Sequence, residues 1–172
     1  MNYFELFGIP QEYSIDSARL AERYRDLQRA VHPDKFADAS DAQRRLSVQK
    51  TAQVNDAYQT LKNPIRRAEH LLELAGVELA AESETLKDMS FLMQQMSWRE
   101  AMDEVKSASD PFAAVDELAS EFDQARGQME QELKTALAQG NDEAHAHAAE
   151  LVRKLKFMAK LSNELDQLED TL

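Results

Sequence analysis

Residues 31–36 read "VHPDKF", and this stretch separates two segments that both have the pattern of amphipathic helices. Proline disfavours the helical conformation at the residue before it, so the first segment is expected to end at His32. The triplet His32-Pro33-Asp34 should therefore form an exposed turn that carries a titratable imidazole and a carboxylate. A turn of this kind suits catalysis, metal binding or recognition, and it can also simply join two helices.

The segment before the triplet has the hydrophobic spacing of a helix that runs to about Val31, with Ser14 as its expected cap. At about 100° per residue, its apolar side chains fall on one stripe, which should face the core. Arg25 and Arg29 then point away from that stripe, into solvent. The stripe consists of Leu20, Tyr24, Leu27 and Val31.

The segment after the triplet predicts a helix from Ser40 or Asp41 to about Lys62. Asn63-Pro64 is a favourable cap and first-residue pair, and Gly76 is a natural stop, so residues 64–75 should form a further helix. A short apolar segment at residues 3–7 precedes them. Two antiparallel helices with an exposed loop between them, plus these short flanking helices, predict a compact domain over residues 1–75.

The rest of the chain predicts a second helical domain. Residues 76–89 are acidic and weakly patterned, and we interpret them as a linker. Amphipathic segments follow at about 90–107, 111–139 and 142–169, with short connections that favour an antiparallel three-helix bundle over residues 90–172. Only four glycines and four prolines occur, and no alternating strand pattern is visible. The sequence therefore predicts an all-α fold.

Composition narrows the possible functions. There is no cysteine, so a disulfide framework or thiolate metal site is excluded. Residues 1–75 carry 11 basic and 11 acidic side chains, whereas residues 76–172 carry 9 and 21. The acidic second half should repel nucleic acid and favour basic partners. No secretory signal or membrane-spanning stretch is visible, so we expect a cytoplasmic protein without membrane or nucleic-acid partners.

The residue pattern gives little indication of enzyme activity. His32 and Asp34 lack an accompanying nucleophile for a catalytic triad. His145 and His147 are two residues apart on a helix and cannot present one face to a shared ion. A helical metalloenzyme would need paired Glu-x-x-His helices, which are absent. We therefore expect no enzyme activity, metal or cofactor.

The context of the triplet resembles a known module. "YFELFGIP", "RYRDLQRAVHPDKF" and "VNDAYQTLKNPIRRAEHLL" are similar to the corresponding parts of a J domain, which docks on DnaK-class chaperones and stimulates their ATP hydrolysis. The resemblance implies that His32, Pro33 and Asp34 are needed for stimulation. It also implies chaperone contacts on the positively charged face of the preceding helix, for which Tyr24, Arg25 and Arg29 are the candidates.

The helix at 90–107 has two apolar stripes, although a bundle helix needs only one. Phe91, Trp98, Met102 and Val105 form the stripe that should face the core. Leu92, Met93 and Met96 lie on the other side, followed by Glu100 and Glu104. This second stripe could pack against the first domain or bind a partner that has apolar and basic residues. Phe157 on the last helix is similarly displaced from its core stripe, and it could pack against the bundle or bind a partner.

"SFLMQQMSWREAMDE" and "VRKLKFMAKL" are similar to segments of the HscB family, the J-type co-chaperones of iron–sulfur cluster assembly. The resemblance covers essentially the whole chain. It implies that the bundle binds the cluster scaffold protein (IscU type), which the co-chaperone delivers to an HscA-type chaperone. The implied scaffold-binding residues are Leu92, Met93, Met96, Glu100, Glu104 and Phe157. Ser97 stands where an acidic residue is often found, which puts one charge contact in doubt.

The expected function is thus that of a non-enzymatic adaptor, which stimulates a DnaK/HscA-class ATPase and delivers the scaffold to it. The alternative is a general J-domain co-chaperone that presents unfolded clients. The methionine-rich stripe would suit that role, because methionine side chains adapt to many partners. Competition by an unrelated unfolded polypeptide would distinguish the two.

Overall fold

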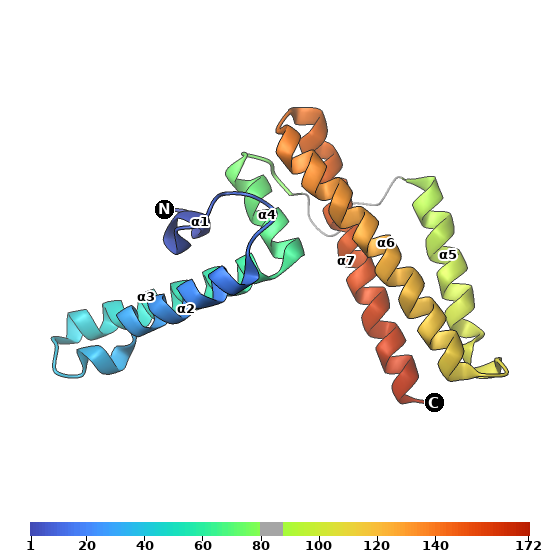
Figure 1. The fold of residues 1–172 in the computed structure, drawn as a ribbon, viewed down its shortest axis with the longest axis horizontal. Helices are drawn as coiled ribbons and strands as arrows, with labels where there is room; N and C mark the ends of the chain where they lie inside the picture. The colour runs from blue at the N-terminus through green and yellow to red at the C-terminus, as the bar shows by residue number, and fades with distance from the viewer. Residues whose placement is uncertain (80–87) are drawn as a thin grey trace. The chain divides into compact units, whose positions relative to one another are not determined.

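A computed structural model of the chain describes residues 1–79 and 88–172, and every regular element in these ranges is helical (Figure 1). This confirms the predicted all-α fold. Contacts divide the chain into two units, residues 1–76 and 77–172. The interpretation of residues 76–89 as a linker falls largely on residues 80–87, which lie outside the described residues.

The first unit is a helical hairpin with a short helix at each end. α2 (Ser17–Val31) and α3 (Asp41–Lys62) pack side by side, and η1, a short 3₁₀ turn at Pro33–Phe36, lies between them in the chain. α1 (Tyr3–Phe7) and α4 (Pro64–Leu74) pack against this hairpin. Its core includes Phe4, Phe7, Leu20, Val54, Ala57 and Leu61.

The ends of these helices follow from local capping chemistry. Ser40 forms a capping box with Gln43, and Asn63 caps α4 ahead of Pro64, both as predicted. The predicted cap at Ser14 is wrong, because the side chain of Asp16 accepts the backbone N–H groups of Ala18 and Arg19. A carboxylate at this position also interacts favourably with the helix dipole, which explains the later start of α2.

α1 is held in place by two contacts with titratable groups. The backbone N–H of Tyr3 donates to Nε2 of His70 over 3.4 Å, and the two rings stack with centroids 4.6 Å apart. Burial lowers the pKa of His70, which favours the neutral ring that this hydrogen bond needs. The hydroxyl of Tyr3 donates to Asp56 over 2.5 Å, and this hydrogen bond raises the pKa of the phenol.

The second unit is a long antiparallel hairpin with a shorter helix against it (Figure 1). α6 (Pro111–Gln139) and α7 (Asp142–Asp170) reverse direction at Gly140, whose φ of 69° is a left-handed conformation that favours glycine. α5 (Met89–Asp103) lies along this hairpin. The shared core contains Phe91, Trp98, Val105, Val115, Leu118, Phe122, Met158, Leu161 and Leu165.

The predicted helix over residues 90–107 is two elements. α5 ends at Asp103, and η2, a 3₁₀ turn at Val105–Ser107, continues the chain. Val105, in this turn, is buried in the core with 1% of its surface exposed. A buried side chain of this size stabilises the fold by roughly 1.5–3 kcal/mol, so Val105 keeps the core position that the periodicity predicts.

Candidate functional site

The loop that carries His32, Pro33 and Asp34 is exposed, and its geometry is set by the proline. His32 has φ −58° and ψ 134°, outside the helical region, so α2 ends there and Pro33 opens η1. The side chains of His32 and Asp34 are 54% and 93% exposed. Both are therefore accessible from solvent.

The imidazole of His32 is oriented by its own loop. Its Nδ1 accepts the backbone N–H of Asp34 over 3.2 Å, so in this geometry the ring proton lies on Nε2, where it can donate outward. The Asp34 carboxylate is 3.6 Å from the same Nδ1. An ion pair there would need a proton on Nδ1, which is incompatible with accepting from the backbone. The loop therefore presents a ring N–H donor and a separate carboxylate.

Two hydroxyl groups of α3 hold the residue just before the loop. Ser47 donates to the backbone oxygen of Val31 over 2.6 Å, and the hydroxyl of Thr51 shares its one proton between that oxygen at 3.2 Å and the backbone oxygen of Ser47 at 2.9 Å. Ser47 is 3% exposed. Because the last carbonyls of a helix lack partners within it, these bonds satisfy the end of α2 and tie it to α3. Sequence reasoning missed both residues, since a serine inside a helix has no distinctive pattern.

Tyr24 lies in the seam between α2 and α3. Its ring stacks on Tyr58 with centroids 3.9 Å apart, and its hydroxyl donates to Asn55 over 2.7 Å. The side-chain amide of Gln28 donates to that hydroxyl over 2.8 Å. Tyr24 is thus half-buried, and part of its side chain stays accessible at the seam.

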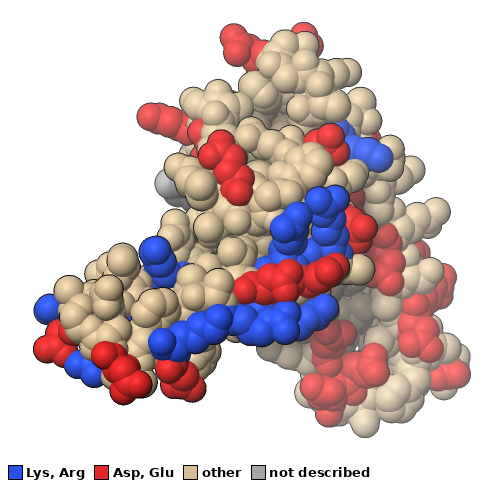
Figure 2. Space-filling view, turned by 60° about the vertical axis from the view of Figure 1, so that its left-hand side comes forward, with Lys and Arg blue, Asp and Glu red and all other residues tan. Residues whose placement is uncertain are grey.

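The arginines predicted to face solvent on α2 do so. Arg25 and Arg29 are both exposed, and Arg29 pairs with Asp26 over 2.6 Å. Basic and acidic side chains are interleaved on the surface that comes forward in Figure 2. An exposed pair of this kind stabilises the fold little, so Arg29 can exchange Asp26 for a partner's carboxylate at small cost.

On α5, the predicted partner-binding residues form an exposed patch. Met93 and Met96 are 67% and 65% exposed, and Glu100 and Glu104 are exposed beside them. Leu92 is half-buried. The other predicted stripe, with Phe91, Trp98 and Val105, is buried in the bundle as expected. We call Leu92, Met93, Met96, Glu100 and Glu104 the α5 patch.

Phe157 lies at the seam between α5 and α7. Its ring meets Phe91 edge-on with centroids 5.8 Å apart, and the guanidinium of Arg99 lies 5.9 Å from its centroid. Arg99 also forms an ion pair with Glu164 of α7. Phe157 therefore helps to position α5 and presents only part of its ring. Sequence reasoning missed Arg99, because nothing in the pattern shows that it reaches across to α7.

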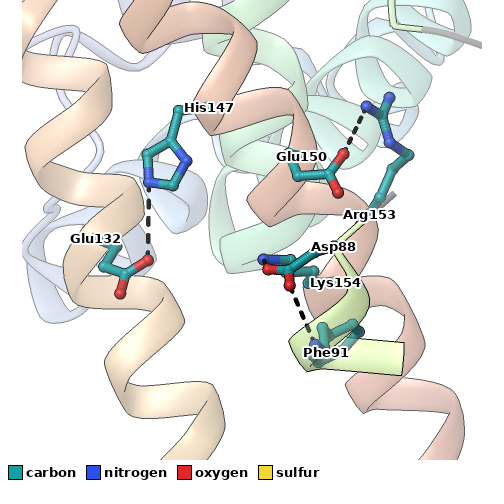
Figure 3. A network of polar contacts seen from close by, with 7 residues as sticks. All are labelled: Asp88, Phe91, Glu132, His147, Glu150, Arg153 and Lys154. Atoms are coloured by element: carbon teal, nitrogen blue, oxygen red, sulfur yellow. Dashed lines mark hydrogen bonds and ion pairs between the residues drawn. The ribbon is translucent and has the colours of Figure 1, made fainter. Parts of the chain in front are cut away.

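A second ion pair with α7 holds the start of α5, in addition to the pair between Arg99 and Glu164. Asp88 caps the helix by accepting the N–H of Phe91 over 3.2 Å, and the ammonium of Lys154 on α7 donates to it over 2.7 Å (Figure 3). The Lys154 ammonium also lies 5.4 Å from the centroid of the Phe91 ring. The hydrogen bond from Lys154, helped by that from Phe91, lowers the pKa of Asp88.

Known proteins match both units of this chain. Residues 2–70 match the family of DnaJ domains, and residues 87–166 match the family described as the HSCB C-terminal oligomerisation domain. "Co-chaperone protein HscB homolog" of Shewanella halifaxensis is 60% identical over 172 residues, which cover 100% of this chain and 99% of the relative. The chain belongs to the HscB family of J-domain co-chaperones.

Solved HscB structures agree with this assignment. HscB from Vibrio cholerae superposes with a TM-score of 0.90 at 44% identity, covering 99% of each chain. The human co-chaperone HscB also gives 0.90 at 28% identity, covering 100% of this chain and 84% of the human one. The predicted family is thereby confirmed. The exposed His-Pro-Asp loop lies in the part of this HscB-family chain that matches DnaJ domains.

The described residues hold neither a cluster suited to a metal ion nor a helix suited to a membrane. Residues 1–79 and 88–172 contain no group of three or more His, Asp or Glu side chains arranged to hold a metal ion. Within the same ranges no helix has the length and apolarity needed to cross a bilayer.

Proposed function

We propose that this HscB-family co-chaperone is a non-enzymatic adaptor of iron–sulfur cluster assembly. The α5 patch binds the cluster scaffold protein of the IscU type. The first unit, residues 1–76, which we call the J unit, engages an HscA-class chaperone and stimulates its ATPase. ATP hydrolysis then traps the scaffold on the chaperone. The protein acts in the cytoplasm, without membrane or nucleic-acid partners.

The observation that carries the proposal is the exposed loop between the two packed helices α2 and α3. His32 and Asp34 are presented to solvent, while the backbone before them is fixed by Ser47 and Thr51. A fixed loop binds a partner with little loss of conformational entropy. The adaptor supplies no chemical group to the hydrolysis. It shifts the chaperone toward its hydrolysing conformation by binding that conformation better.

The α5 patch supports the second half of the proposal. Exposed methionine side chains with carboxylates beside them suit a partner surface that combines apolar and basic residues. This helix is held in place by the burial of Phe91 and Trp98. Two ion pairs, Arg99–Glu164 and Lys154–Asp88, also join it to α7, so the patch is preorganised.

The proposal is tested by the steady-state ATPase rate of the cognate chaperone, with this protein alone and with the scaffold. Stimulation should appear with the wild type, increase with scaffold, and fall at least tenfold for His32→Gln. This substitution keeps a polar side chain at the exposed position. Equal stimulation by the wild type and the variant would contradict the assigned role of the loop.

A general co-chaperone for unfolded clients is the second candidate, because Met93 and Met96 are exposed and methionine adapts to varied partners. An unrelated, permanently unfolded polypeptide should then displace the scaffold from the α5 patch. If the adaptor proposal holds, the scaffold stays bound at a large excess of that polypeptide.

A further inference from the structure

A groove of about 630 Å³ runs between α5 and α6, beside the α5 patch. Its floor is apolar and includes Trp98, Val105 and Leu118, each less than 10% exposed. Its rim carries carboxylates from both sides, Glu104 at the end of α5 and Glu117 and Glu121 on α6. No lysine or arginine is among the described residues that line it.

This groove is continuous with the α5 patch. On a helical wheel of α5 drawn at about 100° per residue, Met93, Glu104 and Ser97 follow one another within about 40°. Glu104 belongs to the patch and also lines the groove, and Ser97 lines the groove next to it. A partner that covers the patch therefore reaches the groove without a gap. Phe157 and Arg99 lie at the seam with α7, on the opposite flank of α5.

The chemistry of the groove fits one kind of side chain. A lysine or arginine can lay its methylene stem on the apolar floor and extend its charged end to carboxylates at the rim. The indole N–H of Trp98 donates to one carboxylate oxygen of Glu121 over 3.2 Å, and this hydrogen bond orients the Glu121 carboxylate at the rim. A carboxylate has a second oxygen that can accept a further hydrogen bond.

We propose that this groove receives a lysine or arginine side chain of the scaffold protein bound at the α5 patch, and that Glu117 of α6 is a specificity-determining residue for that partner. Ser97 lines the same groove but carries no charge. Glu117 and Glu121 supply from α6 the negative charge that α5 lacks at this position. The inference rests on the proposed function and extends the binding surface from one helix to two.

The test measures the dissociation constant of the cognate scaffold for the full-length chain by calorimetry at low and high salt. Glu117→Lys should weaken binding at least tenfold at low salt, with a smaller effect at high salt because ions screen the exposed charges. The matched control is Asp116→Lys. Asp116 is exposed, is the neighbouring residue on α6, and does not line the groove. The same change in charge there should alter the dissociation constant less than threefold.

A second variant tests the groove by gain of affinity. Ser97→Glu adds a carboxylate to the rim and should tighten scaffold binding at low salt by about threefold. Equal weakening by Glu117→Lys and Asp116→Lys, or no effect of either, would overturn the groove inference. If the wild type binds the scaffold and Leu92→Ala weakens that binding, the proposed function survives such a result. If the wild type does not bind the scaffold, the proposed function itself fails.

Discussion

At the scale of single residues, the functional loop depends on neighbours that are not part of it. His32 and Asp34 face solvent, yet the direction in which they point is set by the end of α2. That end is fixed because Ser47 donates to the carbonyl oxygen of Val31, and the Thr51 hydroxyl lies within hydrogen-bond distance of the same oxygen. These hydroxyls are positioning groups, since they reach a partner only through the backbone they hold.

Ser47→Ala should lower the free energy of unfolding of the first unit by about 0.5–1 kcal/mol. The lost hydrogen bond is partly offset by the better helix propensity of alanine, and the Thr51 hydroxyl, 3.2 Å from the Val31 oxygen, can turn toward it. All four tyrosines lie in residues 1–76 and the single tryptophan is Trp98, so tyrosine near-ultraviolet circular dichroism reports on this unit.

The same variant should also reduce chaperone stimulation, by about twofold to fivefold at subsaturating concentration, and Ser47→Thr should restore most of it. Ser17→Ala, an exposed position in the first turn of α2, is the control. A loss of stability with full stimulation would show that the loop does not need this anchor.

At the scale of elements, α5 is the helix whose position matters most for partner binding. It contributes Phe91 and Trp98 to the core, and it is clamped to α7 at both ends of its length. Asp88 serves as cap and as clamp at once, because it accepts from the backbone of Phe91 and from Lys154. Its pKa is lowered by these donors, so its contribution to stability depends on pH.

The direction in which the stability contributed by Asp88 changes with pH follows from the linkage between proton binding and folding. A carboxylate whose pKa is lower in the folded state stabilises the fold above its unfolded pKa, about 4, and loses this contribution as the pH falls through the folded value. Asp88→Asn keeps a capping side chain but removes the charge. It should therefore lower the unfolding midpoint reported by Trp98 fluorescence at pH 7, and the difference from wild type should shrink toward pH 3.

Glu143→Gln, in the first turn of α7, is a control for loss of one exposed charge from the second unit. A difference between Asp88→Asn and wild type that stays constant from pH 7 to pH 3 would show that the Lys154 contact is not the source of the stabilisation.

At the scale of the whole molecule, the proposed function needs both units in one chain. The J unit supplies the loop and the second unit supplies the α5 patch, and each unit has its own core. Joining two binding sites raises the effective concentration of one partner near the other. The protein should therefore be active only when the loop and the α5 patch lie in the same molecule.

Two full-length variants test this expectation. His32→Gln retains the α5 patch, and the double variant Leu92→Ala/Met93→Ala retains the loop. Neither alone should give scaffold-dependent ATPase stimulation, and an equimolar mixture should stay below about one tenth of the wild-type effect. Recovery by the mixture would show that the two sites act independently.

Much of this architecture was determined by the sequence itself, because it depends on local interactions. Helix periodicity, the Ser40 and Asn63 caps, and proline after His32 act within a few residues, so the helices and the exposed loop could be predicted. The exception is the start of α2, where Asp16 and Ser14 compete as caps at short range. The J-domain resemblance likewise rests on contiguous motifs.

Only the tertiary structure decided which side chains meet across helices. The contacts of Arg99 with Glu164, of Lys154 with Asp88, and of Phe157 with Phe91 join residues more than 60 positions apart, and no local pattern encodes them. The same holds for the groove that Glu117 shares with Ser97. Periodicity tells which face of a helix is apolar, but the burial of that face depends on which neighbour packs against it.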